Sequence, residues 1–283
     1  MSALTLKAIA FQPLTQQLFK EPTNTEAAFE WLTHLLAKQT SQVVDILSDD
    51  QRSKIARHFL CSTMIELPFT TGDISWSMVS NMLAQHGTHQ ADTFINAYEC
   101  ASWGYSLRHD LHHNQSSKFL LVSIIDANIY DLEFWRYNEH WHESGFGITT
   151  VLIEVNGQVT NELITQCANT HNSMAEFATV IRRHAAELTD TTLAMPFFPE
   201  NIQQMFDKLL ATESRLDDLH QQWGHCFGSD PWLSILSHCR ENPVREDQDY
   251  LACSLALNGY FAMANITVTP ATQFILQEVQ GYA

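Results

Sequence analysis

Cys100 stands where a cysteine could act as a nucleophile. It follows a short apolar stretch from Thr93 to Tyr98, predicted to be a strand, and it opens CASWGYSLRHDLHH, in which Trp103, Leu107 and Leu111 have helical spacing. A thiol at the start of a helix lies at the positive end of the helix dipole among free backbone N–H groups, which lowers its pKa and favours the thiolate. Such a thiol can accept an acyl group. The alternative is a buried structural cysteine at the end of a strand.

Histidines form the other groupings with chemical potential. His109 and His113 are spaced i, i+4 on the predicted helix after Cys100, so they share a face that could bind a transition metal. There is no HExxH signature, and a polar helix end with adventitious metal affinity is the alternative interpretation. The chain also lacks GxGxxG, P-loop, GxSxG and paired-carboxylate signatures. We therefore predict neither a metal site nor a bound cofactor.

Composition excludes several other classes of function. The 283 residues carry 15 Lys+Arg against 32 Asp+Glu, a formal net charge of −17, so nucleic acid and anionic membranes are disfavoured as partners. The N-terminal sequence lacks the apolar region of a signal peptide, and no apolar run approaches the length of a membrane span, so we expect a cytoplasmic protein. The six cysteines are widely spaced with no CxxC pair, which argues against a zinc ribbon or a disulfide framework.

The elements that must position Cys100 alternate along the chain. Helical patterns cover residues 26–39, 73–83, 100–113, 173–188 and 199–210, and another begins at Asp230-Pro231. Strand patterns cover residues 4–11, 55–62, 93–98, 118–125, 147–155, 191–195, 250–256 and 261–267. This order predicts an α/β fold with largely parallel strand pairing and helices covering the sheets. The same order in both halves suggests duplication, with the seam near residues 155–172.

The region around Cys100 resembles the ketoacyl synthase III family of thiolase-like condensing enzymes. Residues 55–107 match that family in element order, and CASWGYSL keeps the register of the family's nucleophile motif C-A-x-F-x-Y-A-L. LLVSIIDAN resembles the following strand, which ends in an aspartate at Asp126, and SGFGITTVLIE resembles the glycine-containing loop and strand. Near the C-terminus, ALNGYFAMANITV resembles the family's glycine-rich hairpin. The similarity covers most of the chain in element order, although its specific motifs are patchy.

The resemblance implies a fold and a chemistry. The fold is the thiolase-like α-β-α-β-α sandwich of five layers, built from two duplicated βαβ-rich halves, here residues 1–155 and 156–283. Cys100 would form an acyl thioester. The backbone N–H groups of Cys100 and Gly259 would form the oxyanion hole.

Departures from the family pattern change the expected catalytic groups. The family has a histidine in an H-Q-A-N segment where this chain reads MPFFPEN, with Phe197 and Phe198, and it has an asparagine in a G-N segment where this chain has His225. We hypothesise that His225 supplies the acid/base function opposite Cys100 and that Asp230 orients it. The competing interpretation of His225 is a hydrogen-bonded histidine of a loop.

The resemblance also suggests which residues shape the pocket. Trp135 and Trp141 lie in predicted loops near the site, as do Phe197 and Phe198, and all are candidates to narrow it. His140 and His142 fall in a loop that shapes the acyl tunnel in the family, so they are candidates to line the substrate entrance.

Two functions follow as alternatives. The first is an acyltransferase of fatty-acid-related, polyketide or secondary-metabolite biosynthesis that takes acyl groups from coenzyme A or an acyl carrier protein, with Claisen condensation less favoured. The second is a catalytically degenerate partner subunit of a heterodimeric ketosynthase. The family's coenzyme A grip is missing, and Arg182-Arg183 is the one obvious basic candidate for carrier docking. A homodimer or heterodimer would pair along residues 91–98, with the loop at 68–72 near the partner's tunnel.

Overall fold

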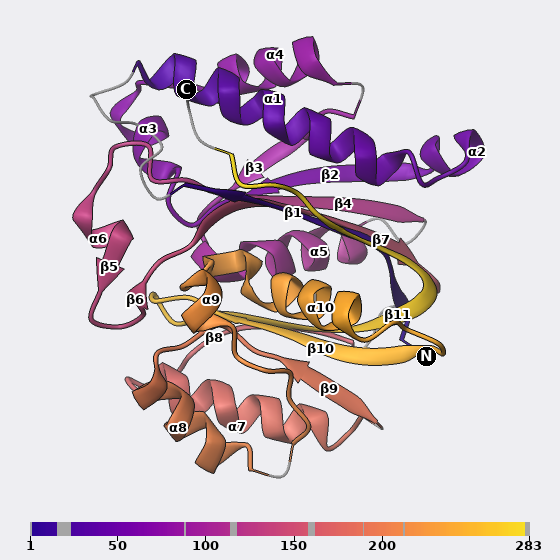
Figure 1. Ribbon diagram of the computed structural model, residues 1–283, viewed down its shortest axis with the longest axis vertical. Coiled ribbons are helices and arrows are strands. Elements are labelled where there is room, and N and C mark those ends of the chain that lie inside the picture. Colours follow the sequence, from indigo (N-terminus) through magenta and orange to yellow (C-terminus); the bar gives the residue numbers. More distant parts are fainter. Residues whose placement is uncertain are drawn as a thin grey trace.

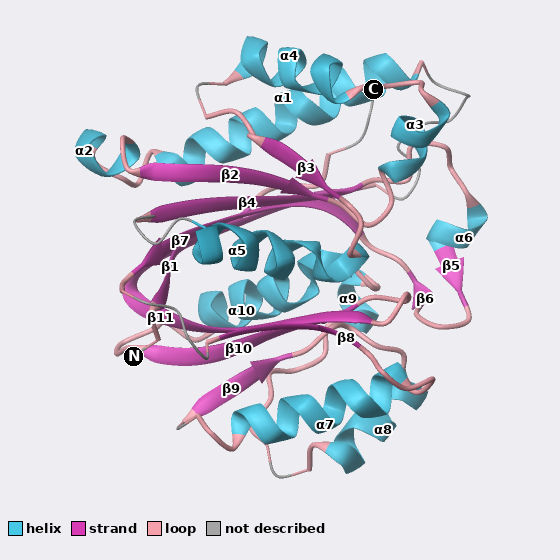
Figure 2. Ribbon diagram, turned by 180° about the vertical axis from the view of Figure 1, so that it is seen from behind, coloured by secondary structure: helices cyan, strands magenta, loops and turns pink. Residues whose placement is uncertain are grey.

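The computed structural model describes residues 2–15, 24–87, 89–113, 118–157, 162–188, 190–211 and 213–280. Helices and strands alternate along these residues, and they stack into five layers, as Figure 1 shows. The predicted α-β-α-β-α arrangement is confirmed. Figure 2 shows the same layers from behind, with helices above, between and below two groups of strands.

The upper sheet comes from the first half of the chain. Its strands run in the order β3, β2, β4, β7 and β1, and β4 is buried at every position, as its unbroken apolar sequence predicts. Helices α1 and α4 cover its outer face. The bounds are β1 (Leu4–Leu14), α1 (Thr25–Val44), α2 (Asp49–Arg52), β2 (Ile55–Cys61), α3 (Glu66–Thr71), α4 (Trp76–His86), β3 (Thr93–Ile95), β4 (Phe119–Asp126) and β7 (Phe146–Val155).

The lower strands come from the second half, and helices α7 and α8 lie beneath them. Strand β8 falls inside the predicted seam and was not expected, because its sequence, LITQC, is short and only partly buried. The bounds are β8 (Leu163–Cys167), α7 (Ser173–Ala185), β9 (Thr191–Ala194), α8 (Glu200–Leu209), α9 (His220–Trp223), β10 (Gln248–Leu255) and β11 (Tyr260–Leu276).

Two buried helices fill the middle layer, α5 (Ser102–His113) and α10 (Asp230–Glu241). They meet through Trp103 and Trp232, whose rings are 4.9 Å apart in an edge-to-face arrangement. Gly104 lets α5 approach β11 closely, because a Cβ at this position would stand 2.3 Å from the Cβ of Ala262. This layer fixes the position of the residues at the start of both helices.

Strand pairing is mixed, which corrects the prediction of largely parallel pairing. Strands β2–β3, β2–β4, β9–β10 and β1–β11 pair in parallel, whereas β1–β7, β4–β7, β10–β11 and β8–β11 are antiparallel. Strands β10 and β11 pair antiparallel because they follow one another without a crossover helix, whereas the other antiparallel pairs join strands separated by further elements.

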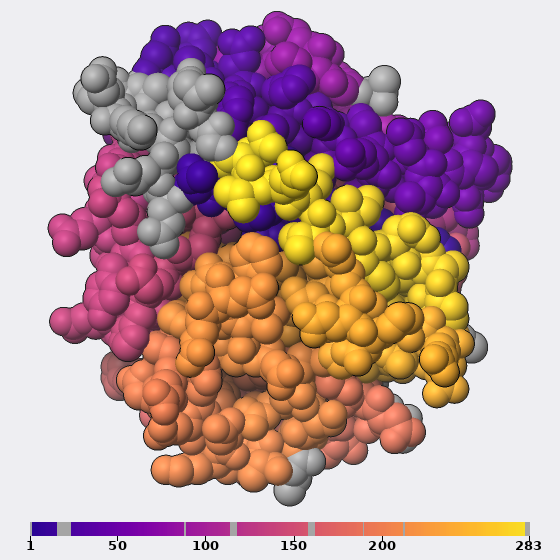
Figure 3. Space-filling view, viewed as in Figure 1, coloured from indigo at the N-terminus to yellow at the C-terminus, as the bar shows by residue number. Residues whose placement is uncertain are grey.

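Strand β11 connects the two sheets. Its first part pairs with β10 and β8, and its last part pairs with β1, so that Phe11 is the partner of Leu276. The β1–β11 register shifts between Leu6 and Ala8 of β1, whose partners in β11 are Val268 and Gln273. Figure 3 shows this yellow segment lying between the indigo N-terminal elements and the orange elements of the second half.

A short arm stands beside the layers, made of α6 (Glu133–Arg136), β5 (Tyr137–Asn138) and β6 (His142–Glu143). Its end is fixed to the second half, because Gly145 N donates to His225 O at 2.9 Å and His225 N donates to Glu143 O at 2.9 Å. Within the described ranges, none of the helices combines the length and the apolar character that crossing a membrane requires.

Candidate active site

Cys100 lies in a one-turn 3-10 helix, η1 (Glu99–Ala101), that leads directly into α5. Glu99 has a left-handed backbone with φ of 46°, a conformation that non-glycine residues adopt at an energetic cost. The side chain of Cys100 is 5% exposed, and Thr63 Oγ1 lies 3.7 Å from its sulfur as a hydrogen-bond donor. Cys100, the candidate nucleophile, therefore lies in a sharp turn between strand β3 and helix α5, as the sequence predicted.

The charge state of Cys100 differs from the prediction. Burial raises the pKa of the thiol well above its ordinary value, and the nearby carboxylates of Asp126, Glu99 and Asp230 raise it further, against a smaller opposing effect of the Thr63 hydrogen bond. The predicted lowering by the helix dipole does not prevail, because desolvation and negative neighbours both disfavour a thiolate. A reaction at this sulfur would therefore need a base to remove the proton.

His225 stands beside Asp230, as the sequence proposed. His225 Nδ1 lies 2.6 Å from Asp230 Oδ2, at ion-pair distance but off the direction of a regular hydrogen bond. Asp230 is fully buried, and its carboxylate also accepts from Cys226 N at 2.6 Å and Phe197 N at 2.9 Å. These contacts fix the carboxylate, which in turn holds the imidazole in place.

A second buried carboxylate, Asp126, ends β4 near the same cluster. Its Oδ1 accepts from Thr63 N at 2.7 Å and from Ser62 Oγ at 3.2 Å, whereas Oδ2 is buried without a hydrogen-bond partner. Burial raises the pKa of Asp126 to about 7, outweighing the hydrogen bonds and the nearby His225, which lower it. The aspartate at the end of the strand was noted from the sequence, but nothing local signalled its burial beside His225.

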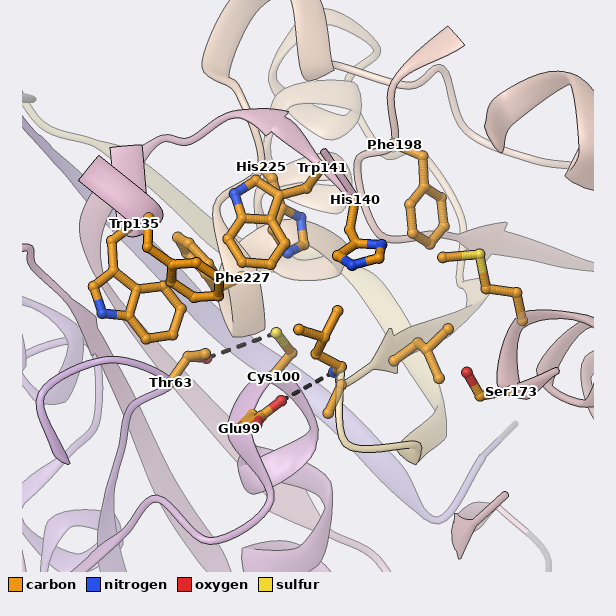
Figure 4. A pocket seen from close by; sticks show the side chains of 15 residues that line it. Thr63, Glu99, Cys100, Trp135, His140, Trp141, Ser173, Phe198, His225 and Phe227 are labelled. Atoms are coloured by element: carbon orange, nitrogen blue, oxygen red, sulfur yellow. Dashed lines mark hydrogen bonds between the residues drawn. The ribbon is translucent and has the colours of Figure 1, made fainter. Parts of the chain in front are cut away.

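A pocket of about 150 Å³ opens over Cys100. Figure 4 shows Cys100 and Thr63 on one side, with Trp135, Trp141, Phe227 and His225 opposite them. The aromatic residues form a wall that includes Trp141, whose ring is 5.8 Å from that of His225, and Phe227, 4.8 Å from His225. The residues that line it are Thr63, Glu99, Cys100, Phe134, Trp135, His140, Trp141, Ser173, Met174, Phe198, His225, Phe227, Leu255, Ala256 and Leu257.

The predicted pocket residues divide into two groups. Trp135, His140, Trp141 and Phe198 line the pocket. Phe197 is instead 1% exposed in the hydrophobic core, where only its backbone N–H touches the site through Asp230. His142 also lies outside the pocket lining, since its ring stacks on Tyr137 in the arm at 5.6 Å.

Gly259 does not offer a free oxyanion-hole donor. With φ of 86° it forms the turn between β10 and β11, and its own N–H donates to Ala256 O at 3.0 Å. The sequence correctly indicated a tight glycine turn, but the turn itself uses that N–H group. The neighbouring N–H groups, of Leu257 and Asn258, donate to the carboxylate of Glu99 at 2.9 and 3.4 Å.

Sequence reasoning missed several pocket residues. Glu99 and Leu257 are 158 positions apart, so no local pattern predicts their contact. Thr63 lies directly after a predicted strand and Phe227 follows His225, and neither position has a distinctive pattern. The structure adds no further ligands to the predicted His109–His113 metal pair. Among the residues that the structure describes, no group of three or more His, Cys, Asp or Glu side chains is placed to hold a metal ion.

The five layers, with a cysteine turn at the head of a middle-layer helix, define the thiolase-like fold. Comparison with solved structures agrees. A 3-oxoacyl-[acyl-carrier-protein] synthase III from Aquifex aeolicus superposes with a TM-score of 0.61 at 10% identity, covering 93% of this chain and 99% of that one. The acyltransferase ChlB3 gives a TM-score of 0.62 at 12% identity, covering 95% of this chain and 98% of that one.

A third similar structure is the HMG synthase of the curacin biosynthetic pathway, solved in complex with an acetyl donor-ACP. Its TM-score is 0.57 at 14% identity, covering 96% of this chain and 80% of that one. At these identities the likeness establishes the fold, and the ketoacyl synthase III resemblance found in the sequence is confirmed at that level. The sequence matches no protein-family model and no curated protein.

Proposed function

We propose that this protein is a ketoacyl synthase III-like acyltransferase that carries an acyl group as a thioester on Cys100. The observation that carries the proposal is that Cys100 and His225, from different elements, line one pocket, with the buried carboxylate of Asp230 next to His225. A buried carboxylate that holds a histidine beside a buried thiol is the arrangement that nucleophilic catalysis requires.

The chemistry follows from the high thiol pKa. His225 Nε2 would accept the Cys100 proton while Sγ attacks the carbonyl carbon of the donor thioester. The bond between that carbon and the donor sulfur breaks, and the donor leaves as a thiol after taking the proton from His225. An acceptor nucleophile then attacks the acyl-cysteine, and its proton passes through His225 to the departing sulfur of Cys100, which is released as the thiol. Asp230 would stabilise the imidazolium formed between the two proton transfers.

The pocket suggests the kind of acyl group. Its volume of about 150 Å³ and its aromatic wall of Trp135, Trp141 and Phe227 suit a short apolar chain. The donor would be coenzyme A or an acyl carrier protein. The curacin-pathway neighbour bound to its donor-ACP supports a carrier, whereas the charge of −17 requires a local basic contact such as the exposed Arg182 and Arg183.

A pairing surface is available for a homodimer or a heterodimer. Strand β3 is the last strand of the upper sheet, so one side of its backbone has no neighbouring strand within the described chain. Such an edge can extend a sheet across two subunits. This supports the dimer proposed along residues 91–98.

The test is intact-protein mass spectrometry after exposure to acyl-CoA and acyl-carrier thioesters. Wild-type protein should gain a hydroxylamine-labile acyl mass, Cys100→Ala should not, and Cys226→Ala, which removes another buried thiol, should still gain it. Acyl loading that persists in Cys100→Ala would refute the assignment of the nucleophile.

One observation favours the alternative of a degenerate partner subunit. The family's histidine position falls in the segment of Phe197, which is buried in the core, and the Cys100 thiol has a raised pKa. Condensation would lack one of its usual groups. If wild-type protein loads no donor alone, and a co-purified ketosynthase-like partner loads only in its presence, the degenerate role replaces the acyltransferase.

A further inference from the structure

A carboxylate occupies two backbone donors of the hairpin beside the Cys100 pocket. Glu99 Oε2 accepts from Leu257 N at 2.9 Å and from Asn258 N at 3.4 Å, and Glu99, Cys100 and Leu257 line the same pocket. Figure 4 shows the carboxylate of Glu99 reaching across to this backbone below the sulfur of Cys100. Two convergent N–H groups that hold one carboxylate oxygen form an anion site.

The conformation of Glu99 directs its side chain to this site. Its backbone is left-handed, with φ of 46°, which costs free energy in a residue other than glycine. Its carboxylate is partly buried, and burial together with the charge of Glu66 raises its pKa, although the two backbone hydrogen bonds lower it. The contact with the hairpin offsets these costs, and it links the residue before the nucleophile to the turn between β10 and β11.

The chemistry of thioester attack needs the same donors. When a thiol attacks a thioester carbonyl, negative charge develops on the carbonyl oxygen, and backbone N–H groups stabilise it. Gly259 N–H is already bonded to Ala256 O, and the next hairpin donors, the N–H groups of Leu257, which lines the pocket, and of Asn258, are bonded to Glu99. A carboxylate in that place removes two donors and adds a repulsive charge beside the developing oxyanion.

We propose that Glu99 is a gate: its carboxylate occupies the oxyanion site of Cys100, and acylation requires it to leave the Leu257 and Asn258 N–H groups. The inference builds on the proposed acyl transfer at Cys100. A substrate carbonyl displaces the carboxylate, so loading is slow until a donor bound in the pocket drives Glu99 away. Glu99 thereby acts as a residue that limits the reaction of Cys100 with unselected thioesters.

The experiment compares two reagents at the same sulfur. S-phenyl thioacetate acylates a thiol through a tetrahedral oxyanion, whereas iodoacetamide alkylates it without one. Peptide mass spectrometry follows Cys100 in wild type, Glu99→Ala and Glu99→Gln, and the exposed Cys167 of the same chain is the internal reference. Removing the charge of Glu99 also increases the fraction of Cys100 that is thiolate, which speeds both reactions. Dividing the acylation rate by the alkylation rate cancels that contribution.

We expect the ratio of the acylation rate to the alkylation rate at Cys100 to rise at least tenfold in Glu99→Ala. Oxyanion donors each contribute about 10²- to 10³-fold to acyl transfer. Glu99→Gln, which keeps a neutral acceptor for the N–H groups, should give a smaller rise. Glu66→Gln, which removes the neighbouring charge but leaves the hairpin contact, should match wild type. A ratio that stays unchanged or falls in both Glu99 variants overturns the gate.

Failure of the gate is distinguishable from failure of the proposed function. If biological thioesters never load Cys100 while the ratio with S-phenyl thioacetate rises as expected, the gate stands and the acyltransferase falls. If biological thioesters load wild type and the ratio does not rise, the acyltransferase stands and the gate falls. Should Glu99→Ala not fold, as judged by its thermal unfolding, the Glu99→Gln ratio decides alone.

Discussion

The turns that lead into the two middle-layer helices resemble each other. Turn η1 precedes α5, and turn η2 (Phe227–Ser229) precedes α10. Each contains a non-glycine residue with a left-handed backbone, Glu99 with φ of 46° and Phe227 with φ of 54°, and each has a buried cysteine in or beside it. The turns pack together, because a Cβ on Gly228 would stand 3.2 Å from the carbonyl oxygen of Cys100.

The two cysteines nevertheless have different surroundings. Cys100 lines the pocket under Thr63, whereas Cys226 points to the carbonyl oxygens of Trp223 at 3.7 Å and Gly224 at 3.9 Å within the core. Burial raises the pKa of both thiols. The local turn therefore does not make a cysteine reactive. Cys100 differs in lining a pocket together with His225, the proposed base, which lies two residues before the second turn.

The largest expected effect concerns this division of roles. His225→Asn should lower acyl transfer about 10²- to 10⁴-fold, because the high pKa of Cys100 makes a base necessary. His140→Asn, at the exposed rim of the same pocket, should change it only a few-fold. Steady-state transfer rates for both variants test the contrast. Equal losses of acyl-transfer rate in His225→Asn and His140→Asn would contradict the difference drawn between the two turns. A loss in Cys226→Ala as large as that in His225→Asn would contradict it as well.

The next effect is a pH dependence of stability that originates at Asp126. Its folded-state pKa of about 7 lies above the value in an unfolded chain, so the unfolded state releases the proton first. The contribution of Asp126 to stability should therefore fall as pH rises from about 4 to 7, by up to roughly 4 kcal/mol, and level off above that range. Asp126→Asn should remove this decline. Urea unfolding at pH 5 and pH 8 measures it, and an unchanged slope in the variant would exclude Asp126 as its source.

A smaller difference separates the two tryptophans of the middle layer. Trp103 Nε1 donates to Ser254 Oγ at 2.8 Å, whereas Trp232 Nε1 is buried without a hydrogen-bond partner. Trp103→Phe loses a hydrogen bond and volume, but Trp232→Phe loses volume and removes an unsatisfied donor. The first variant should be about 1–2 kcal/mol less stable than the second in urea unfolding. The reverse order would contradict the assigned polar contacts.

The smallest expected effect is at the hairpin. Gly259→Ala places a side chain at φ of 86°, where space is available because the nearest atom, the Cβ of Ala168, is 3.6 Å away. The cost should be about 1 kcal/mol of backbone strain, with acyl transfer nearly unchanged because the Gly259 N–H serves the turn. A large fall in transfer with normal stability would restore this glycine to the catalytic machinery.

The sequence predicted the order of the main elements because the hydrophobic periods are long and distinct. The completely buried β4 and the helix after Cys100 are examples. It did not predict β8 or the β5–β6 arm, whose segments are short and partly exposed. The mixed strand directions were also missed, since they depend on which distant strands meet rather than on the sequence of any one strand.

At the site, the sequence indicated Cys100, His225 and Asp230 through motif register. It could not indicate that Phe197 turns into the core while Phe198 lines the pocket, because adjacent residues of a loop point in directions that only packing decides. It also gave the wrong direction for the pKa of Cys100. The helix start is local and readable, whereas the desolvation and the carboxylates that outweigh it come from distant segments.

The pairing of β1 with the end of β11 has a consequence for how the chain acquires its structure. Phe11 and Leu276 become partners only after synthesis has reached Leu276. Contacts between such distant residues slow folding, since the entropy of closing a long loop is lost before the contact forms. During synthesis, one edge of β1 stays unpaired until the end of β11 has been made. The pocket over Cys100 forms only when residues 227–257 have packed against the N-terminal sheet. In a nascent chain, the Cys100 thiol is therefore present long before the pocket around it has formed.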